Sequence, residues 1–133
     1  MDERTEQSDL TETEIDALHR VELAAEWLHR AHGDLVGFHH KTGHAVDHLD
    51  AAQELLREAG HDDLADAIRD EYLPRGVIDG DRWSYDVLES FQSGFLADVD
   101  DLAERARTDV ADGRRHVRER RQESEWKRQA ERE

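Results

Sequence analysis

The segment from Ala17 to Ala59 reads ALHRVELAAEWLHRAHGDLVGFHHKTGHAVDHLDAAQELLREA. Small and apolar residues recur along it at alternating steps of four and three, and no step is missed. A repeat of about 3.5 residues held over this length is typical of a helix that keeps one side, here called the seam, against a partner helix. The seam positions, of which only Thr42 is neither small nor apolar, are Ala17, Val21, Ala24, Leu28, Ala31, Leu35, Phe38, Thr42, Ala45, Leu49, Ala52, Leu56 and Ala59.

Three glycines, Gly33, Gly37 and Gly43, interrupt this segment without shifting its phase. Each costs about 1 kcal/mol relative to alanine inside a helix. Because a loop of arbitrary length would reset the phase of the seam, we expect one continuous helix from about residue 12 to 59. A break near Gly33 is the alternative. The glycines fall on the face away from the seam, where they would let a second backbone come close or would simply soften the helix.

The ends of this helix are marked by local chemistry. Thr11 and Glu14 have the spacing of a capping box, and Leu10 and Ile15 that of a hydrophobic staple. Gly60 has the place of a helix-terminating residue. These residues predict where the long helix begins and ends.

The rest of the chain predicts two further helices. A short one covers about residues 62–73 and ends before Pro74, and a long one covers about residues 83–117. Residues 1–10 are expected to be a disordered acidic N-terminus, 11–117 a single helical domain, and 118–133 a charged, partly helical tail.

Two long helices joined by a compact elbow predict an all-α fold, an elongated antiparallel helical hairpin with the short helix at its elbow. A two-helix layer leaves its apolar sides open, so we expect the hairpin to complete a four-helix bundle as a homodimer, or to bind another protein. The residues expected in the oligomer seam are Leu28, Leu35, Phe38, Leu49, Leu56, Phe91, Phe95 and Leu102.

Composition gives the chain a strongly acidic character. Its 133 residues include 34 acidic and 18 basic side chains, a net charge of −16, and only Lys41 and Lys127 are lysines. This resembles proteins of salt-accumulating, halophilic archaea. At molar salt the Debye length falls to roughly 3 Å, so dense carboxylates stop repelling one another. We therefore expect the fold to require high monovalent salt.

The same composition excludes several classes of site and location. With no cysteine, disulfides and thiolate metal sites are excluded. No apolar run predicts a membrane span and no signal peptide is expected, so we expect a cytoplasmic protein. Nucleic acid is not expected as a partner, because glutamates interleave with the arginines of residues 114–121 and the acidic body repels phosphate. That basic run is better suited to an acidic patch, such as one on a second copy.

Histidine is the unusual feature, with six of nine lying between residues 29 and 48. His40 and His44, with Asp47 nearby, have the spacing with which one helix face holds a metal ion. Glu26 and His29 form a Glu-x-x-His unit that resembles half of the ligand set of ferritin-like di-iron bundles.

The other explanation of this histidine-rich segment needs no metal. A ferritin-like ligand set requires a second Glu-x-x-His unit, and no second unit lies within a predicted helix. His32 and His39 flank the seam and are expected to be buried hydrogen-bonding groups. The main expectation is therefore that the chain binds no cofactor. A divalent transition metal on His40, His44, Asp47, His29 and Glu26 is the alternative, and a shared response to acid is another.

Three short stretches, Gly37–His44, Tyr72–Gly76 and Trp83–Asp86, together resemble an uncharacterised family of acidic helical proteins from haloarchaea. The likeness covers most of residues 13–117 and implies no activity. No complete catalytic constellation is visible in the sequence. We therefore expect a non-enzymatic structural or protein-interaction module, with a helical metal-binding protein that uses the cluster from His29 to His48 as the alternative.

Overall fold

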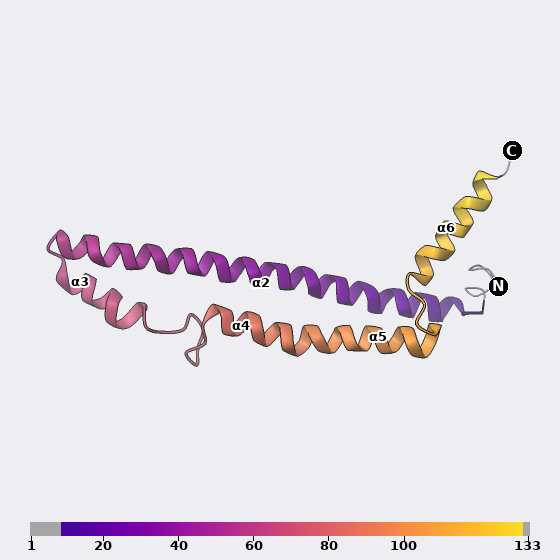
Figure 1. Ribbon diagram of the computed structural model, residues 1–133, viewed down its shortest axis with the longest axis horizontal. Coiled ribbons are helices and arrows are strands. Elements are labelled where there is room, and N and C mark those ends of the chain that lie inside the picture. Colours follow the sequence, from indigo (N-terminus) through magenta and orange to yellow (C-terminus); the bar gives the residue numbers. More distant parts are fainter. Residues whose placement is uncertain (1–8, 132–133) are drawn as a thin grey trace. The chain divides into compact units, whose positions relative to one another are not determined.

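The computed structural model describes residues 9–131, and these form an all-helical fold without a strand, as predicted. The contacts divide the chain into two compact units that share the first helix: Met1–His29 with Phe95–Glu133, and Arg30–Gly94. No helix built from the described residues carries an apolar run that would let it cross a bilayer. The elements, with η for π-helical segments, are α2 (Glu12–Glu58), α3 (Asp62–Ala67), η1 (Ile68–Tyr72), α4 (Ser84–Phe91), η2 (Gln92–Leu96), α5 (Ala97–Ala111) and α6 (Val117–Ala130) (Figure 1).

Helix α2 begins and ends where its sequence places the start and stop residues. The Thr11 amide donates to Glu14 Oε1 at 2.9 Å and the Glu14 amide to Thr11 Oγ1 at 3.0 Å, which confirms the capping box. At the other end Gly60 has φ +89°, a left-handed value that glycine adopts without strain. The Gly60 amide donates to the Arg57 carbonyl and the His61 amide to the Leu56 carbonyl, so the last carbonyls of α2 are satisfied.

Between these ends α2 runs for 47 residues through all three internal glycines. A Cβ atom placed on Gly33, Gly37 or Gly43 would meet nothing within 4 Å. No second backbone therefore approaches them within the described part of the chain. The close approach that these glycines would permit is not used there.

The first unit has a small apolar core where the start of α2 meets α5 and α6. Its buried members are Ile15, Leu18, Ala111 and Val117, with Leu10 packed against them. Helices α2 and α5 run in opposite directions in this unit. Ile15 near the start of α2 lies with Ala111 at the end of α5, whereas His29, further along α2, contacts Asp100 near the start of α5. Leu10 is therefore part of the core, contrary to the disorder expected for residues 1–10, and residues 1–8 lie outside the described residues.

The third helix is shorter than predicted, and the prediction that it reaches residue 117 is wrong. It is interrupted at η2, where Gly94 has non-helical angles, and α5 ends at Ala111. Asp112 and Gly113 follow with left-handed backbones at φ 53° and 81°, and the amides of both donate to the Arg107 carbonyl. Val117 instead opens α6, after a further left-handed residue, His116.

The region expected to be a charged tail forms α6, which is fixed to the start of α2. Val117 is only 2% exposed and anchors the helix in the core of the first unit. Arg121 pairs with Glu12, Arg118 Nη1 lies 3.7 Å from Asp16 Oδ1, and Arg114, just before the helix, pairs with Asp9 at 3.2 Å. The acidic patch that these arginines meet is thus on the same chain. Residues 132–133 lie outside the described residues.

The second unit packs the remainder of α2 with α3, η1 and α4. His32 and His39 of α2 contact Gln92 and Ser84, so the pairing is again antiparallel. Near the end of α2, Arg57 Nη1 donates to Asp66 Oδ1 of α3 at 2.9 Å.

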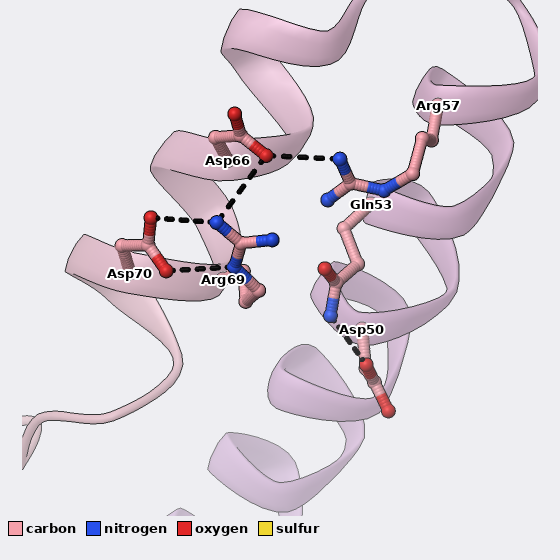
Figure 2. Close-up of polar contacts among 6 residues, drawn as sticks. All are labelled: Asp50, Gln53, Arg57, Asp66, Arg69 and Asp70. Atoms are coloured by element: carbon pink, nitrogen blue, oxygen red, sulfur yellow. Dashed lines mark hydrogen bonds and ion pairs between the residues drawn. The ribbon is translucent and has the colours of Figure 1, made fainter.

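The Arg57–Asp66 contact belongs to a small chain of charges (Figure 2). Asp66 also contacts Arg69 of η1, and Arg69 donates two hydrogen bonds to Asp70, at 2.7 and 2.9 Å. These bonds from Arg69 lower the pKa of the Asp70 carboxyl. Of these contacts, Arg57–Asp66 joins α3 to the end of α2, and because both side chains are partly exposed, salt screens it.

At the start of α2 the buried face lies one residue, about 100° on an α-helix, from the predicted seam. Ile15 and Leu18, the buried residues of α2, are not seam positions. The predicted seam residues Leu28, Leu35, Phe38, Leu56 and Phe91 are half-buried, and Leu49, Phe95 and Leu102 are 38%, 62% and 49% exposed. In α3 the buried residue is Ala65.

Candidate functional site

A pocket of about 520 Å³ lies in the first unit, between the N-terminal part of α2, α5 and the start of α6. Six of its lining residues are acidic and two are arginines, so its walls carry a net charge of −4 with the histidines neutral. The lining residues are Glu22, Ala25, Glu26, His29, Asp100, Asp101, Ala103, Glu104, Arg107, Arg115, His116 and Glu119. Such a charged lining attracts cations.

Helix periodicity explains how α2 supplies one wall. His19, Glu22, Glu26 and His29 follow at steps of three, four and three, which keeps them on one side of a helix. The last three line the pocket, and His19 lies beside Glu22 at its end. The sequence therefore holds two mirrored units, His-x-x-Glu and Glu-x-x-His. The sequence analysis identified only the second, and the first was the available clue to the site.

Three ligand-type side chains meet at the end of this pocket. Ligand atoms of His19, Glu22 and Glu119 all lie within 4.8 Å of one another. His19 Nδ1 is 3.6 Å from Glu119 Oε2, beyond hydrogen-bond distance, and this buried nitrogen has no hydrogen-bond partner in the described structure. The side chains of His19 and Glu119 are 22% and 52% exposed. We call these three residues the His19 cluster.

The electrostatics of the His19 cluster are unfavourable for two ionised carboxylates. Burial raises the pKa of Glu22, and the nearby Glu119 carboxylate raises it further. His116, Arg107 and His19 act in the opposite direction without cancelling the effect. The folded chain thus holds a carboxyl whose charge is poorly compensated.

Two other carboxylates of the pocket, those of Asp100 and Glu104, have partners. His29 Nε2 lies 2.9 Å from both carboxylate oxygens of Asp100. Arg107 donates to Glu104 Oε2 at 2.6 Å, and this bond lowers the pKa of Glu104. Asp100 and Glu104 thus have partners, whereas Glu22 and Glu119 of the His19 cluster bring two carboxylates close to each other.

The ligands proposed from the sequence are not gathered in this way. Glu26 lines the pocket and His29 pairs with Asp100, while His40, His44 and Asp47 are exposed on the part of α2 that belongs to the second unit. None of the five belongs to the ligand group found among residues 9–131.

Two histidines of the same segment behave in part as the sequence predicts. His39 Nδ1 lies 2.8 Å from Ser84 Oγ, and Ser84 is buried. His32 Nε2 lies 2.8 Å from Gln92 Nε2. Both rings are hydrogen-bonded, as expected, but they are half-buried and not buried.

Comparison with known proteins adds no assignment to this geometry. No protein-family model, no curated protein and no solved structure matches the chain. Two features of the chain itself bear on its function, the exposed seam residues and the His19 cluster.

Proposed function

We propose that the chain is a non-enzymatic helical interaction protein of the cytoplasm of a salt-accumulating archaeon, and that its first partner is a second copy of itself. The observation that carries this proposal is the exposure of large apolar residues at predicted seam positions. Leu49 in the second unit and Phe95 and Leu102 in the first are each more than a third exposed. Because these positions belong to the predicted heptad seam, we infer that a partner helix covers them.

A second copy is the simplest occupant of this seam. A regular heptad stripe is complementary to itself, and a two-fold axis lets each copy cover the seam of the other. Within each unit α2 already pairs with an antiparallel helical segment, so two copies supply the helices for the proposed hairpins and four-helix bundle. Each copy carries a net charge of −16, so two copies repel each other. Association is therefore favoured only where salt screens this repulsion.

The proposed origin rests on the composition and on the family resemblance described above. The excess of acidic side chains and the near absence of lysine suit a cytoplasm that contains molar salt. High salt would screen the repulsion between two such copies and strengthen the burial of their apolar seams.

The test compares two leucines of α2 that differ in register. Leu49→Glu places a charge on the seam, and Leu55→Glu places the same charge on the same helix off the seam, at a residue that is 64% exposed. We expect a dimer by sedimentation equilibrium in concentrated KCl for the native chain and for Leu55→Glu, and a monomer for Leu49→Glu. Circular dichroism checks that all three are equally helical. A monomeric native chain, or equal behaviour of the two variants, would refute the proposal.

Metal binding by the histidine-rich segment is the second candidate function. Contacts in the described structure argue against it, because three of these histidines already have side-chain partners. His29, His32 and His39 are engaged with Asp100, Gln92 and Ser84. Better-placed ligands form the His19 cluster, with His19 and Glu22 earlier in α2 and Glu119 in α6.

A further inference from the structure

We propose that His19, Glu22 and Glu119 bind one divalent transition-metal ion, and that this ion joins α6 to α2. The proposal goes beyond association through the seam, and the two can fail separately. It concerns residues of the first unit alone.

The ligand set has the composition and position that such an ion requires. One imidazole nitrogen and two carboxylate oxygens suit Zn²⁺, Mn²⁺ or Co²⁺. The three ligand atoms lie within 4.8 Å of one another, and ligands of one ion at about 2.1 Å each are at most about 4.2 Å apart. Glu119, whose side chain is half-exposed, would adjust its oxygen to the ion on binding.

The unsatisfied nitrogen of His19 is the independent sign of a ligand. Its Nδ1 atom is buried, faces Glu119 and makes no hydrogen bond among the described residues. Buried polar atoms in folded proteins almost always have a partner, so a buried nitrogen without one is a candidate ligand atom. A divalent metal ion would give His19 Nδ1 a bonding partner and would also neutralise the charges of the Glu22 and Glu119 carboxylates.

The surrounding structure holds the ligands in place before the ion arrives. His19 and Glu22 are one helical turn apart on α2. Glu119 lies in the first turn of α6, two residues after the buried Val117. The pairs Arg118–Asp16 and Arg121–Glu12 fix how α6 is rotated about its axis. Preorganised ligands lose less conformational entropy on binding.

A protonated His19 between the two glutamates is the competing explanation. It would balance the charge without any metal and would also leave the pocket acidic. The two explanations predict different cation binding. Coordination depends on three residues and persists at high salt. Electrostatic attraction of a cation to the acidic pocket is shared by all its carboxylates, and salt screens it.

The experiment measures Co²⁺ binding to the full-length protein, purified without an affinity tag and stripped with a chelator, at two KCl concentrations. Equilibrium dialysis gives stoichiometry, and the visible absorption of Co²⁺ reports nitrogen and oxygen coordination. Variants His19→Gln, Glu22→Gln and Glu119→Gln remove one ligand each. Glu26→Gln and His29→Gln are the matched controls, because they change the same residue types in the same pocket.

We expect one Co²⁺ per chain, displaced by Zn²⁺, at both salt concentrations. Each ligand variant should weaken binding by about 10–100-fold or more, the range seen when even outer-shell partners are lost. The two pocket controls and the double variant His40→Gln/His44→Gln should bind as the native chain does. Hydrogen exchange of the α6 amides should slow when metal is added to the native chain but not to Glu119→Gln.

Three results would overturn the inference. One is the absence of saturable binding. Another is an equal loss in Glu26→Gln and Glu22→Gln, which would show diffuse attraction to the pocket. The third is loss of binding in His40→Gln/His44→Gln, which would return the site to the exposed histidines. Each can occur whether or not the chain dimerises, so the seam proposal is tested independently.

Discussion

At the scale of single residues, Gly76 is the glycine at which an added Cβ atom would clash with backbone. A Cβ atom there would lie 2.5 Å from backbone atoms of Asp81 and Arg82, and backbone cannot rotate away as a side chain can. We expect Gly76→Ala to destabilise the chain by about 1–3 kcal/mol, the usual cost of overpacking. Denaturant titration at fixed KCl measures it.

The matched control for Gly76 is another glycine with open space around it. At Gly43, inside α2, an added Cβ meets nothing within 4 Å. Gly43→Ala should therefore stabilise the chain by about 1 kcal/mol through helix propensity. The two alanine variants should have opposite signs, and equal signs would mean that the turn around Gly76 is not packed as described.

Glu22 gives a second prediction at this scale, one of stability against pH. Because burial and Glu119 raise its folded-state pKa above the usual 4.5, folding favours the protonated carboxyl. Its contribution to stability is thus present below pH 4.5 and is lost as pH rises through the raised value. His116, Arg107 and His19 oppose this without reversing it.

Glu22→Gln, which stays neutral, should be more stable than the native chain at neutral pH when divalent metal is absent. The difference should vanish below the ordinary carboxyl pKa, where both side chains are uncharged. Thermal melts at a series of pH values, in chelator, measure it. A Gln variant that is less stable at neutral pH would show that the Glu22 charge is compensated in the folded state.

At the scale of elements, the start of α2 depends on one reciprocal pair. Thr11 Oγ1 accepts from the Glu14 amide, and Glu14 Oε1 accepts from the Thr11 amide. Removing the hydroxyl in Thr11→Ala should cost about 1 kcal/mol, the usual value of an N-cap. Thr13→Ala is the control, since Thr13 is exposed on the same turn. Equal melting temperatures for the two variants would argue against the cap.

Local interactions explain which elements could be predicted from the sequence. The cap at Thr11, the stop at Gly60 and the length of α2 depend on residues within a few positions of one another. The end of α5 was missed although Gly113 stood in the sequence, because Val117 continued the apolar spacing. Spacing cannot distinguish a residue that continues a helix from one that begins the next helix in the same core.

The candidate site was harder to predict because its residues are distant in sequence. Glu26 and His29 were identified from their spacing on one helix, and both lie at the pocket. His19 and Glu119 are 100 residues apart, and they meet because the left-handed turn before α6 returns Val117 to the core. A helical pattern gives the face on which His19 lies but not the element that covers that face.

At the scale of the whole molecule, charge decides the conditions under which the fold survives. Even if all 18 basic side chains were paired, 16 of the 34 carboxylates would have no cationic partner. Salt weakens attractive pairs such as Arg57–Asp66 and repulsion between unpaired carboxylates alike. Exposed pairs contribute at most about 1 kcal/mol each. Because the repulsion involves more charges, its screening should dominate.

We therefore expect the melting temperature to rise steadily with KCl up to molar concentrations, where the Debye length is about 3 Å. Asp66→Asn separates the two effects. It removes the Arg57–Asp66 attraction and one negative charge, so it should destabilise slightly at low salt and be indistinguishable from the native chain at high salt. Replacing chloride by sulfate at equal ionic strength should raise the melting temperature further, through stronger apolar burial. A melting temperature independent of KCl would mean that repulsion between carboxylates does not limit stability. It would refute the prediction that the fold requires salt.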